Sequence, residues 1–114
     1  IPDSVTSIGK NAFAGCESLT NITISDGVTD IGDSAFYSCE SLTSVTIGES
    51  VTSIGENPFI GCTNLTAVTF LGDAPKLDNG VFVIENPTIY RKPEAKGWGD
   101  TFAGRPVKLI SEKP

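Results

Sequence analysis

The amino-acid sequence predicts a β-rich solenoid: stacked repeats form a parallel sheet, with short turns or helical segments between the strands and a cap at the C-terminal end. Three observations support this class. A 23-residue pattern recurs without a gap. Apolar and polar residues alternate within each copy, as in a strand with one buried face. The length of 114 residues suits one domain, and because a 23-residue unit cannot enclose a core alone, its copies are expected to stack.

The repeats are expected to occupy residues 1–87. One partial copy, three full copies and one degenerate copy follow one another, at residues 1–4, 5–27, 28–50, 51–73 and 74–87. The degenerate copy keeps Leu77 and Phe82 in register. It departs from the pattern at Glu85, where Cys is expected, and at Thr88, where Leu is expected.

The end of each copy predicts a strand with one buried face. Its apolar positions are Leu19, Ile22 and Ile24 in the first copy, Leu42, Val45 and Ile47 in the second, and Leu65, Val68 and Phe70 in the third. β-Branched residues and Thr fill the strand, which suits a pleated surface. Strands of successive copies would pair in parallel at about 4.8 Å.

The start of each copy predicts a second inward-facing run, formed by Val5 and Ile8 in the first copy. Gly9 follows this run and is expected to mark a tight turn, and Phe13 then places one ring inside. The equivalent residues are Val28, Ile31, Gly32 and Phe36 in the second copy, and Val51, Ile54, Gly55 and Phe59 in the third. Ladders of Leu, Ile or Val, and Phe should therefore run along the solenoid axis.

The last part of the chain, residues 88–114, is expected to be a C-terminal cap, because a solenoid would otherwise expose an apolar end to water. Trp98 and Phe102 are four residues apart and could share one face of a short helical turn that covers this end. The glycines that flank Trp98 argue against a long helix. A final short strand is expected at 107–110. Basic residues concentrate in this part, at Arg91, Lys92, Lys96, Arg105 and Lys108.

The repeated pattern I-P-x-x-V-T-x-I-G-x-x-A-F-x-x-C-x-x-L-T-x-V-T-I resembles the BspA-like, bacterial surface-antigen type of leucine-rich repeat. The resemblance extends from Ile1 to Phe70, and the segment from Thr88 to Pro93 with the stretch after it resembles the cap of such proteins. It implies a leucine-rich-repeat solenoid in a secreted or surface-attached protein, often large and modular. Some members of the class adhere to host proteins. The resemblance implies no catalytic residues.

Charge and composition exclude several function classes. Residues 1–73 carry a net charge of −8 and residues 74–114 a net charge of +2. An acidic solenoid repels phosphates and anionic lipids, so nucleic acids and membrane surfaces are not expected as partners. No apolar run is long enough to span a membrane. The sequence contains no His, the usual acid–base group near pH 7 and the commonest metal ligand, so we expect no enzyme, no metal and no cofactor.

The three cysteines, Cys16, Cys39 and Cys62, occupy one repeat position and should stack as a ladder. Their spacing along the axis is compatible with the Cα separation of a disulfide, but in-register neighbours point the same way and three thiols cannot all pair. A structural zinc site needs four ligands. The favoured interpretation is a small buried hydrophobe in each copy.

Two further patterns have functional interpretations that we weigh against simpler ones. Asp30 and Asp33 could suggest acid–base or calcium chemistry, but no calcium-binding pattern accompanies them, so they are interpreted as solvated variable positions. Asn21-Ile-Thr and Asn64-Leu-Thr match the N-glycosylation acceptor pattern. Glycosylation would apply only to a eukaryotic protein, and Thr recurs in the repeat anyway.

The outward positions of the predicted strands form a candidate binding face on the inner, concave surface of the sheet. They are Asn21, Thr23, Ser25, Ser44, Thr46, Ala67, Thr69 and Leu71, with Gly48 at the equivalent position of the second copy. Solenoid concavities commonly bind ligands. The alternative is a Thr ladder that only stabilises the sheet, because small neutral groups make poor hot spots.

These observations predict a cell-surface or secreted module for protein–protein interaction or adhesion, with a host or matrix protein or a glycan as partner. The alternatives are a structural spacer or stalk, or a non-catalytic appendage of a larger surface protein or enzyme. The chain opens in mid-pattern without Met or a signal peptide, so we expect a piece of a longer protein that carries the targeting signal elsewhere. Its uncapped N-terminal edge, Ile1–Val5, is expected to favour end-to-end self-association.

Overall fold

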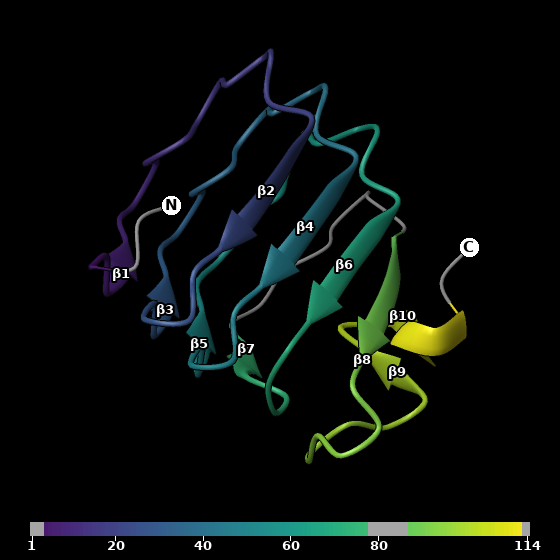
Figure 1. The fold of residues 1–114 in the computed structure, drawn as a ribbon. Coiled ribbons are helices and arrows are strands. Elements are labelled where there is room, and N and C mark those ends of the chain that lie inside the picture. The colour runs from purple at the N-terminus through teal and green to yellow at the C-terminus, as the bar shows by residue number, and fades with distance from the viewer. Residues whose placement is uncertain (1–3, 78–86, 113–114) are drawn as a thin grey trace.

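The structure is a computed structural model that describes residues 4–77 and 87–112. The chain coils into a β-solenoid with two parallel sheets, as the repeat pattern predicts. Figure 1 shows the longer strands β2, β4 and β6 side by side, with the short strands β1, β3, β5 and β7 across the core from them. We refer to residues 5–27, 28–50 and 51–73 as coils one, two and three.

The long-strand sheet contains six strands in the order β2-β4-β6-β8-β10-β9. Their bounds are Asn21–Ile24 for β2, Ser44–Ile47 for β4, Ala67–Phe70 for β6, Thr88–Arg91 for β8, Thr101–Phe102 for β9 and Arg105–Leu109 for β10. All neighbours in this sheet are parallel except β9 and β10. The antiparallel pair lies after the last full copy of the repeat.

The short-strand sheet contains four two-residue strands in the order β1-β3-β5-β7. Their bounds are Ser7–Ile8, Asp30–Ile31, Ser53–Ile54 and Lys76–Leu77. All pair in parallel. Between a short strand and the next long strand the chain runs through turns, which we call the turn side of the coil (residues 9–18 in coil one).

The register of the long strands keeps the 23-residue spacing through coil three and then shortens. Ile22 pairs with Val45, and Val45 pairs with Val68. Val68 then pairs with Ile89, which lies only 21 residues further along the chain. Thr88, which 23-residue spacing aligns with Leu65, therefore lies opposite Ala67. Phe82, which was expected to keep the register, and Glu85, which was expected to depart from it, fall outside the described residues.

The core consists of the predicted apolar ladders. The rings of Phe13 and Phe36 stack with their centroids 5.3 Å apart and an interplanar angle of 2°. The rings of Phe36 and Phe59 stack with a centroid distance of 5.5 Å and an interplanar angle of 8°. Phe36 and Phe59 are fully buried, as are Leu42 and Ile47 of the long-strand side. The stacking of identical positions is confirmed, because each coil presents the same side chain to the next.

A turn or bend follows the glycine at the end of each short strand, as predicted, but these glycines do not adopt the left-handed backbone conformation. A turn does follow Gly9, but the left-handed backbone lies two residues later, at Asn11 with φ 59°, and at the equivalent Ser34 and Asn57. At Gly32, an added Cβ would lie 2.7 Å from the backbone nitrogen of Lys10 in the preceding coil. At Gly32 and Gly55 the glycine is thus needed for close packing against the preceding coil rather than for a special φ angle, whereas Gly9 has nothing within 4 Å.

The segment around Trp98 and Phe102 contradicts the predicted helical turn. Phe102 lies in strand β9, which forms a hairpin with β10 through a turn with positive φ at Ala103 and Gly104. The centroids of the two rings nevertheless lie 4.8 Å apart. The centroid of the Phe70 ring lies 4.9 Å from that of Trp98 and 5.2 Å from that of Phe102. The assignment of residues 88–114 as a cap stays a prediction.

The strand expected at 107–110 is present as β10, which begins two residues earlier and ends at Leu109. A three-residue 3-10 helix, Ile110–Glu112, follows it. Among the residues that the structure describes, no helix is long and apolar enough to cross a membrane.

Candidate binding face on the long-strand sheet

The strands bring most of the predicted face residues into two columns. Thr23, Thr46 and Thr69 pair in register in one column, and Asn21, Ser44 and Ala67 pair in the other. They share one side of the sheet because alternate residues of a strand point to opposite faces. Ser25 and Leu71 lie just beyond the ends of β2 and β6, in the loops.

Exposure of this face falls from coil one to coil three. Asn21 and Thr23 are exposed, and Ser44, Thr46 and Ala67 are partly buried. Thr69 is only 5% exposed, and Tyr90, which follows it in the same column, is 7% exposed. The accessible polar side chains of the face therefore lie on coils one and two, and coil three adds the partly buried apolar residues Ala67 and Leu71.

Tyr90 belongs to the column that contains Thr69, although the sequence analysis did not place it there. The alternation in Thr88-Ile-Tyr-Arg is a strand signal, but its 21-residue spacing from β6 falls outside the repeat. A column of small hydroxyls thus ends in an aromatic ring. Thr69 remains an outward residue of the sheet, yet it offers a partner little surface.

The accessible groups are small, neutral and polar. Asn21 contributes an amide, and Thr23, Ser44 and Thr46 contribute hydroxyls that can each donate and accept a hydrogen bond. None of the eight predicted face residues is charged. Such a surface suits a neutral polar partner, and each contact contributes little compared with Trp, Tyr or Arg.

A neighbouring column of threonines links successive coils through hydrogen bonds from their hydroxyls. The hydroxyl of Thr43 donates to the carbonyl of Thr20 at 3.0 Å, and that of Thr66 donates to the carbonyl of Thr43 at 3.1 Å. The start of the coils repeats the device: the hydroxyl of Thr52 donates to the carbonyl of Thr29 at 3.3 Å. These threonines stabilise the stack, whereas Thr23 and Thr46 remain on its outer surface.

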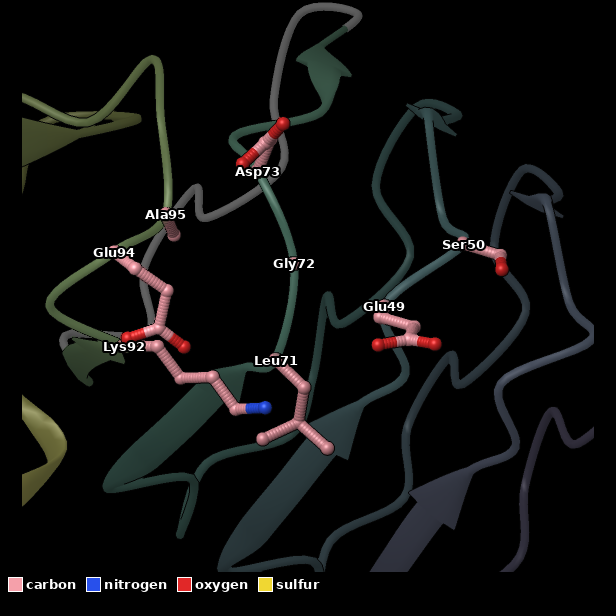
Figure 2. Close-up of a pocket in the computed structure, with 8 residues that line it drawn as sticks. All are labelled: Glu49, Ser50, Leu71, Gly72, Asp73, Lys92, Glu94 and Ala95. Carbon is pink, nitrogen blue, oxygen red and sulfur yellow. The ribbon is translucent and has the colours of Figure 1, made fainter.

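A hollow of about 420 Å³ lies beside the C-terminal ends of the long strands (Figure 2). It is lined by Glu49, Ser50, Leu71, Gly72, Asp73, Lys92, Glu94 and Ala95. Figure 2 shows the side chain of Lys92 extending toward that of Leu71, the predicted face residue nearest this hollow. The lining mixes one cation with three carboxylates. In the described part of the chain, no group of three or more His, Cys, Asp or Glu residues is arranged to hold a metal ion.

Several acidic side chains serve as links between coils. A carboxylate oxygen of Asp33 accepts the backbone N–H of Glu56 at 2.8 Å, and one of Asp73 accepts that of Lys96 at 2.8 Å. Asp30 is exposed and accepts a hydrogen bond from the hydroxyl of Thr29 at 2.9 Å. Asp33, interpreted from the sequence as a solvated variable position, therefore has a structural hydrogen bond that its spacing alone did not reveal.

The thiol ladder lies mostly in the core. Cys39 and Cys62 are fully buried, and their thiols donate to the carbonyls of Phe13 at 3.1 Å and Phe36 at 3.0 Å. Burial raises the pKa of the Cys39 thiol, which keeps it protonated at neutral pH and a poor nucleophile. All three cysteines are free thiols, and Cys16 is partly buried. The prediction of buried packing residues is confirmed for Cys39 and Cys62.

Asn64 takes part in the same coil-to-coil bonding. Its side-chain amide donates to the carbonyl of Glu40 at 2.7 Å. A glycan on this nitrogen would have to replace that hydrogen bond, so the contact favours a structural role for Asn64 over glycosylation.

Comparison with known proteins adds one match. No curated protein and no solved structure was found to match the chain. The family model of the BspA type leucine-rich repeat region matches residues 1–89, in six copies.

Proposed function

The chain belongs to the BspA-type leucine-rich repeat family, and from this premise we propose that it is a recognition module of a cell-surface or secreted protein. Its task is protein–protein interaction or adhesion, and its partner is a host or matrix protein or a glycan. The observation that carries the proposal is the accessible polar face of coils one and two, formed by Asn21, Thr23, Ser44 and Thr46 on in-register strands.

Rigidity supports this proposal. Each coil is tied to the next by both sheets, by the threonine columns and by hydrogen bonds of the turn side, such as Phe13 N–H to the carbonyl of Ala35 at 2.7 Å. A preorganised surface loses little conformational entropy on binding. Small polar groups on such a scaffold can therefore hold fixed positions relative to one another, which is what a specific but modest contact requires.

The size of the groups determines how affinity would arise. Because single Thr, Ser and Asn contacts contribute little, affinity should grow with the number of coils that a partner spans. A partner with an extended neutral polar surface fits this arrangement better than a small charged molecule does.

A non-catalytic role is part of the proposal. The chain has no His, and the buried Cys39 thiol is protonated and hydrogen-bonded in the core. The carboxylates of Asp33 and Asp73 accept backbone hydrogen bonds that hold coils together. These groups are engaged in structure, which supports a binding rather than a chemical function.

The test is a binding screen of the chain against purified matrix and plasma proteins and a glycan array. The variant Thr46→Arg places a large cation in the centre of the accessible face. Ser53→Arg makes the same kind of change at an exposed strand residue of the short-strand sheet and serves as the matched control. Thr69→Arg is unsuitable, because Thr69 is buried and its replacement would disturb packing.

Two outcomes decide between the proposal and its main alternative. Binding that Thr46→Arg abolishes and Ser53→Arg preserves, with both variants folded by circular dichroism, supports recognition by this face. Absence of binding to every probe would favour a structural spacer, a role that the small neutral character of the face also suits.

A further inference from the structure

A hollow of about 490 Å³ lies on the short-strand side of the solenoid. Figure 1 shows that this side is across the core from the long strands, which carry the candidate binding face. The lining comes from strands β3, β5 and β7 and from the turns that begin after the short strands. Among the described residues, none lines both this hollow and that of Figure 2, so the two are separate surfaces.

Two rows of exposed side chains border the hollow. Asp30, Ser53 and Lys76 form the first row, because they pair in register on β3, β5 and β7. Lys10 and Asp33 form the second row, and they occupy equivalent positions of coils one and two, 23 residues apart. All five residues are exposed. The rows follow the stacking of the coils, so the hollow extends along the solenoid axis.

Glycine backbone also lines the hollow. Gly32 and Gly55 come between the residues of the two rows in the sequence. An added Cβ would lie 2.7 Å from the backbone nitrogen of Lys10 at Gly32, and 2.8 Å from that of Asp33 at Gly55. The N–H groups of both glycines already donate to carbonyls of the preceding coil, at 2.7 Å and 2.8 Å. Recognition in the hollow therefore depends on the side chains of the two rows.

The charges of the two rows are arranged by sign along the solenoid axis. The carboxylates of Asp30 and Asp33 both belong to coil two. Lys10 belongs to coil one and Lys76 to the strand that follows coil three, so one cation lies toward each end. Glu56 is the next residue of the second row and adds negative charge beside coil three. The hollow therefore has a negative middle and positive ends.

The two carboxylates of coil two are held in place but keep acceptor capacity. One oxygen of Asp30 accepts the hydroxyl of Thr29 at 2.9 Å, and one oxygen of Asp33 accepts the backbone N–H of Glu56 at 2.8 Å. A carboxylate has two oxygens and about four lone-pair sites. Each can therefore also accept a hydrogen bond from a cationic side chain of a partner, and hydrogen bonds between two charged groups are the stronger kind.

We propose that this hollow, which we call the short-strand groove, binds an extended segment of a partner protein. In that segment, one basic residue has an acidic residue two positions before it and another two positions after it. Lys10 and Lys76 are three coil steps apart, roughly 14 Å at about 4.8 Å per step. An extended chain covers about 13 Å in four residues, and residues i, i+2 and i+4 of a strand lie on one face. The basic side chain then meets Asp30 and Asp33, and the acidic side chains meet the lysines.

A polypeptide is the class of partner that offers this order of charges. Nucleic acids and acidic glycans carry anionic groups, which the carboxylates of coil two repel. A uniformly basic segment is repelled by the lysines at the two ends. A protein segment can place both signs of charge at a two-residue spacing on one side of an extended chain. The inference concerns a different side of the coil from the proposed function and does not rest on it.

The experiment is a titration of the 114-residue chain with the end-blocked peptide Glu-Thr-Arg-Thr-Glu, followed by ¹H–¹⁵N spectra. We expect saturable shift changes that cluster at residues 10, 30–33, 53–55 and 76. The charge-inverted peptide Arg-Thr-Glu-Thr-Arg should show no saturable binding. The rearranged peptide Glu-Glu-Arg-Thr-Thr has the same composition and should bind about two- to fivefold more weakly, which corresponds to the loss of one exposed ion pair.

Two substitutions locate the binding. Ser53→Arg places a cation in the middle of the groove and should abolish binding of the peptide, whereas Thr46→Arg, on the long-strand sheet, should leave it unchanged. Lys76→Ala should weaken binding about two- to fivefold. In the screen for an adhesion partner, the same variants separate the two surfaces: loss with Thr46→Arg alone indicates the long-strand face, and loss with Ser53→Arg alone indicates the groove.

Four results would overturn the proposal: no saturable binding of the first peptide, shift changes that map outside the groove, equal affinity of the charge-inverted peptide, or unchanged affinity of folded Ser53→Arg. If Ser53→Arg does not fold, the comparison of the chain with Lys76→Ala decides, and equal affinities would then contradict the groove.

Discussion

Coil one and coil three differ in how their aromatic core residues are packed. At the N-terminal end, Phe13 stacks on Phe36 on one side and lines an open apolar hollow, so it is only partly buried. In coil three, Phe70 packs against the rings of Trp98 and Phe102 and is 2% exposed. The repeat supplies both Phe13 and Phe70, but the rings that pack on Phe70 lie outside the repeat.

This difference shows which core contacts the repeat provides and which depend on residues outside it. Each coil packs against the next through equivalent residues. A coil at the end of a stack therefore has one face without a neighbouring coil. The aromatic pair Trp98 and Phe102 has no equivalent in the 23-residue pattern. The indole N–H of Trp98 also donates to the carbonyl of Gly72 at 3.2 Å, which anchors the covering segment to coil three.

The largest effect is expected from removing a ring of the aromatic ladder. Phe36→Ala should lower the free energy of unfolding by about 3–5 kcal/mol, the range for a fully buried Phe, because Phe36 has a ring on both sides. Phe13→Ala should cost clearly less, since its outer side is open. Urea unfolding followed by circular dichroism measures both, and equal losses would mean that the N-terminal end is as well covered as the interior.

The next effect concerns the covered end. Trp98→Ala should lower the free energy of unfolding by about 2 kcal/mol, less than the usual range for a fully buried Trp because Trp98 is partly buried. It should also expose Phe70 and increase the fluorescence of a hydrophobic dye. A variant with unchanged dye fluorescence would show that Trp98 does not shield this end.

A smaller effect should distinguish coil one from coil two at equivalent glycines. Gly32→Ala should destabilise by about 1–3 kcal/mol, as overpacking does, because its Cβ would lie 2.7 Å from Lys10 N. Gly9→Ala has nothing within 4 Å of its Cβ and should be neutral or stabilising by less than about 1 kcal/mol. Thermal unfolding of the matched pair measures the difference, and similar losses in both variants would contradict the open N-terminal end.

The smallest effect is a dependence on alkaline pH. Burial raises the pKa of the Cys39 thiol above that of the same thiol in the unfolded chain, so the stability that goes with the neutral thiol is complete at pH values below the unfolded-state pKa. It is lost as the pH rises from there through the folded-state pKa, because the unfolded chain ionises first. The free energy of unfolding, measured across this pH range, should fall more steeply for the chain with Cys39 than for Cys39→Ala. Parallel curves for the two proteins would show that the Cys39 thiol makes no such contribution.

Sequence reasoning succeeded where the same residue type recurs at the same position. The Phe, Leu and Ile or Val ladders, the parallel pairing of the long strands and the buried Cys39 and Cys62 all follow from the gapless register. The outward columns of the candidate face follow from the same alternation. The buried state of Thr69 did not, because it depends on a neighbouring strand whose spacing breaks the repeat.

The strict period of the sequence is enough to predict the fold class and which residue positions stack on one another. The reason is that every coil repeats the contacts of the one before it. The tertiary structure alone decided how the non-repeating residues are used. It placed β8 at a 21-residue spacing, put Phe102 in a hairpin rather than a helical turn, and buried Thr69, so that the accessible polar groups of the face lie on coils one and two. The physical reason is that these features depend on contacts between segments that share no periodic pattern.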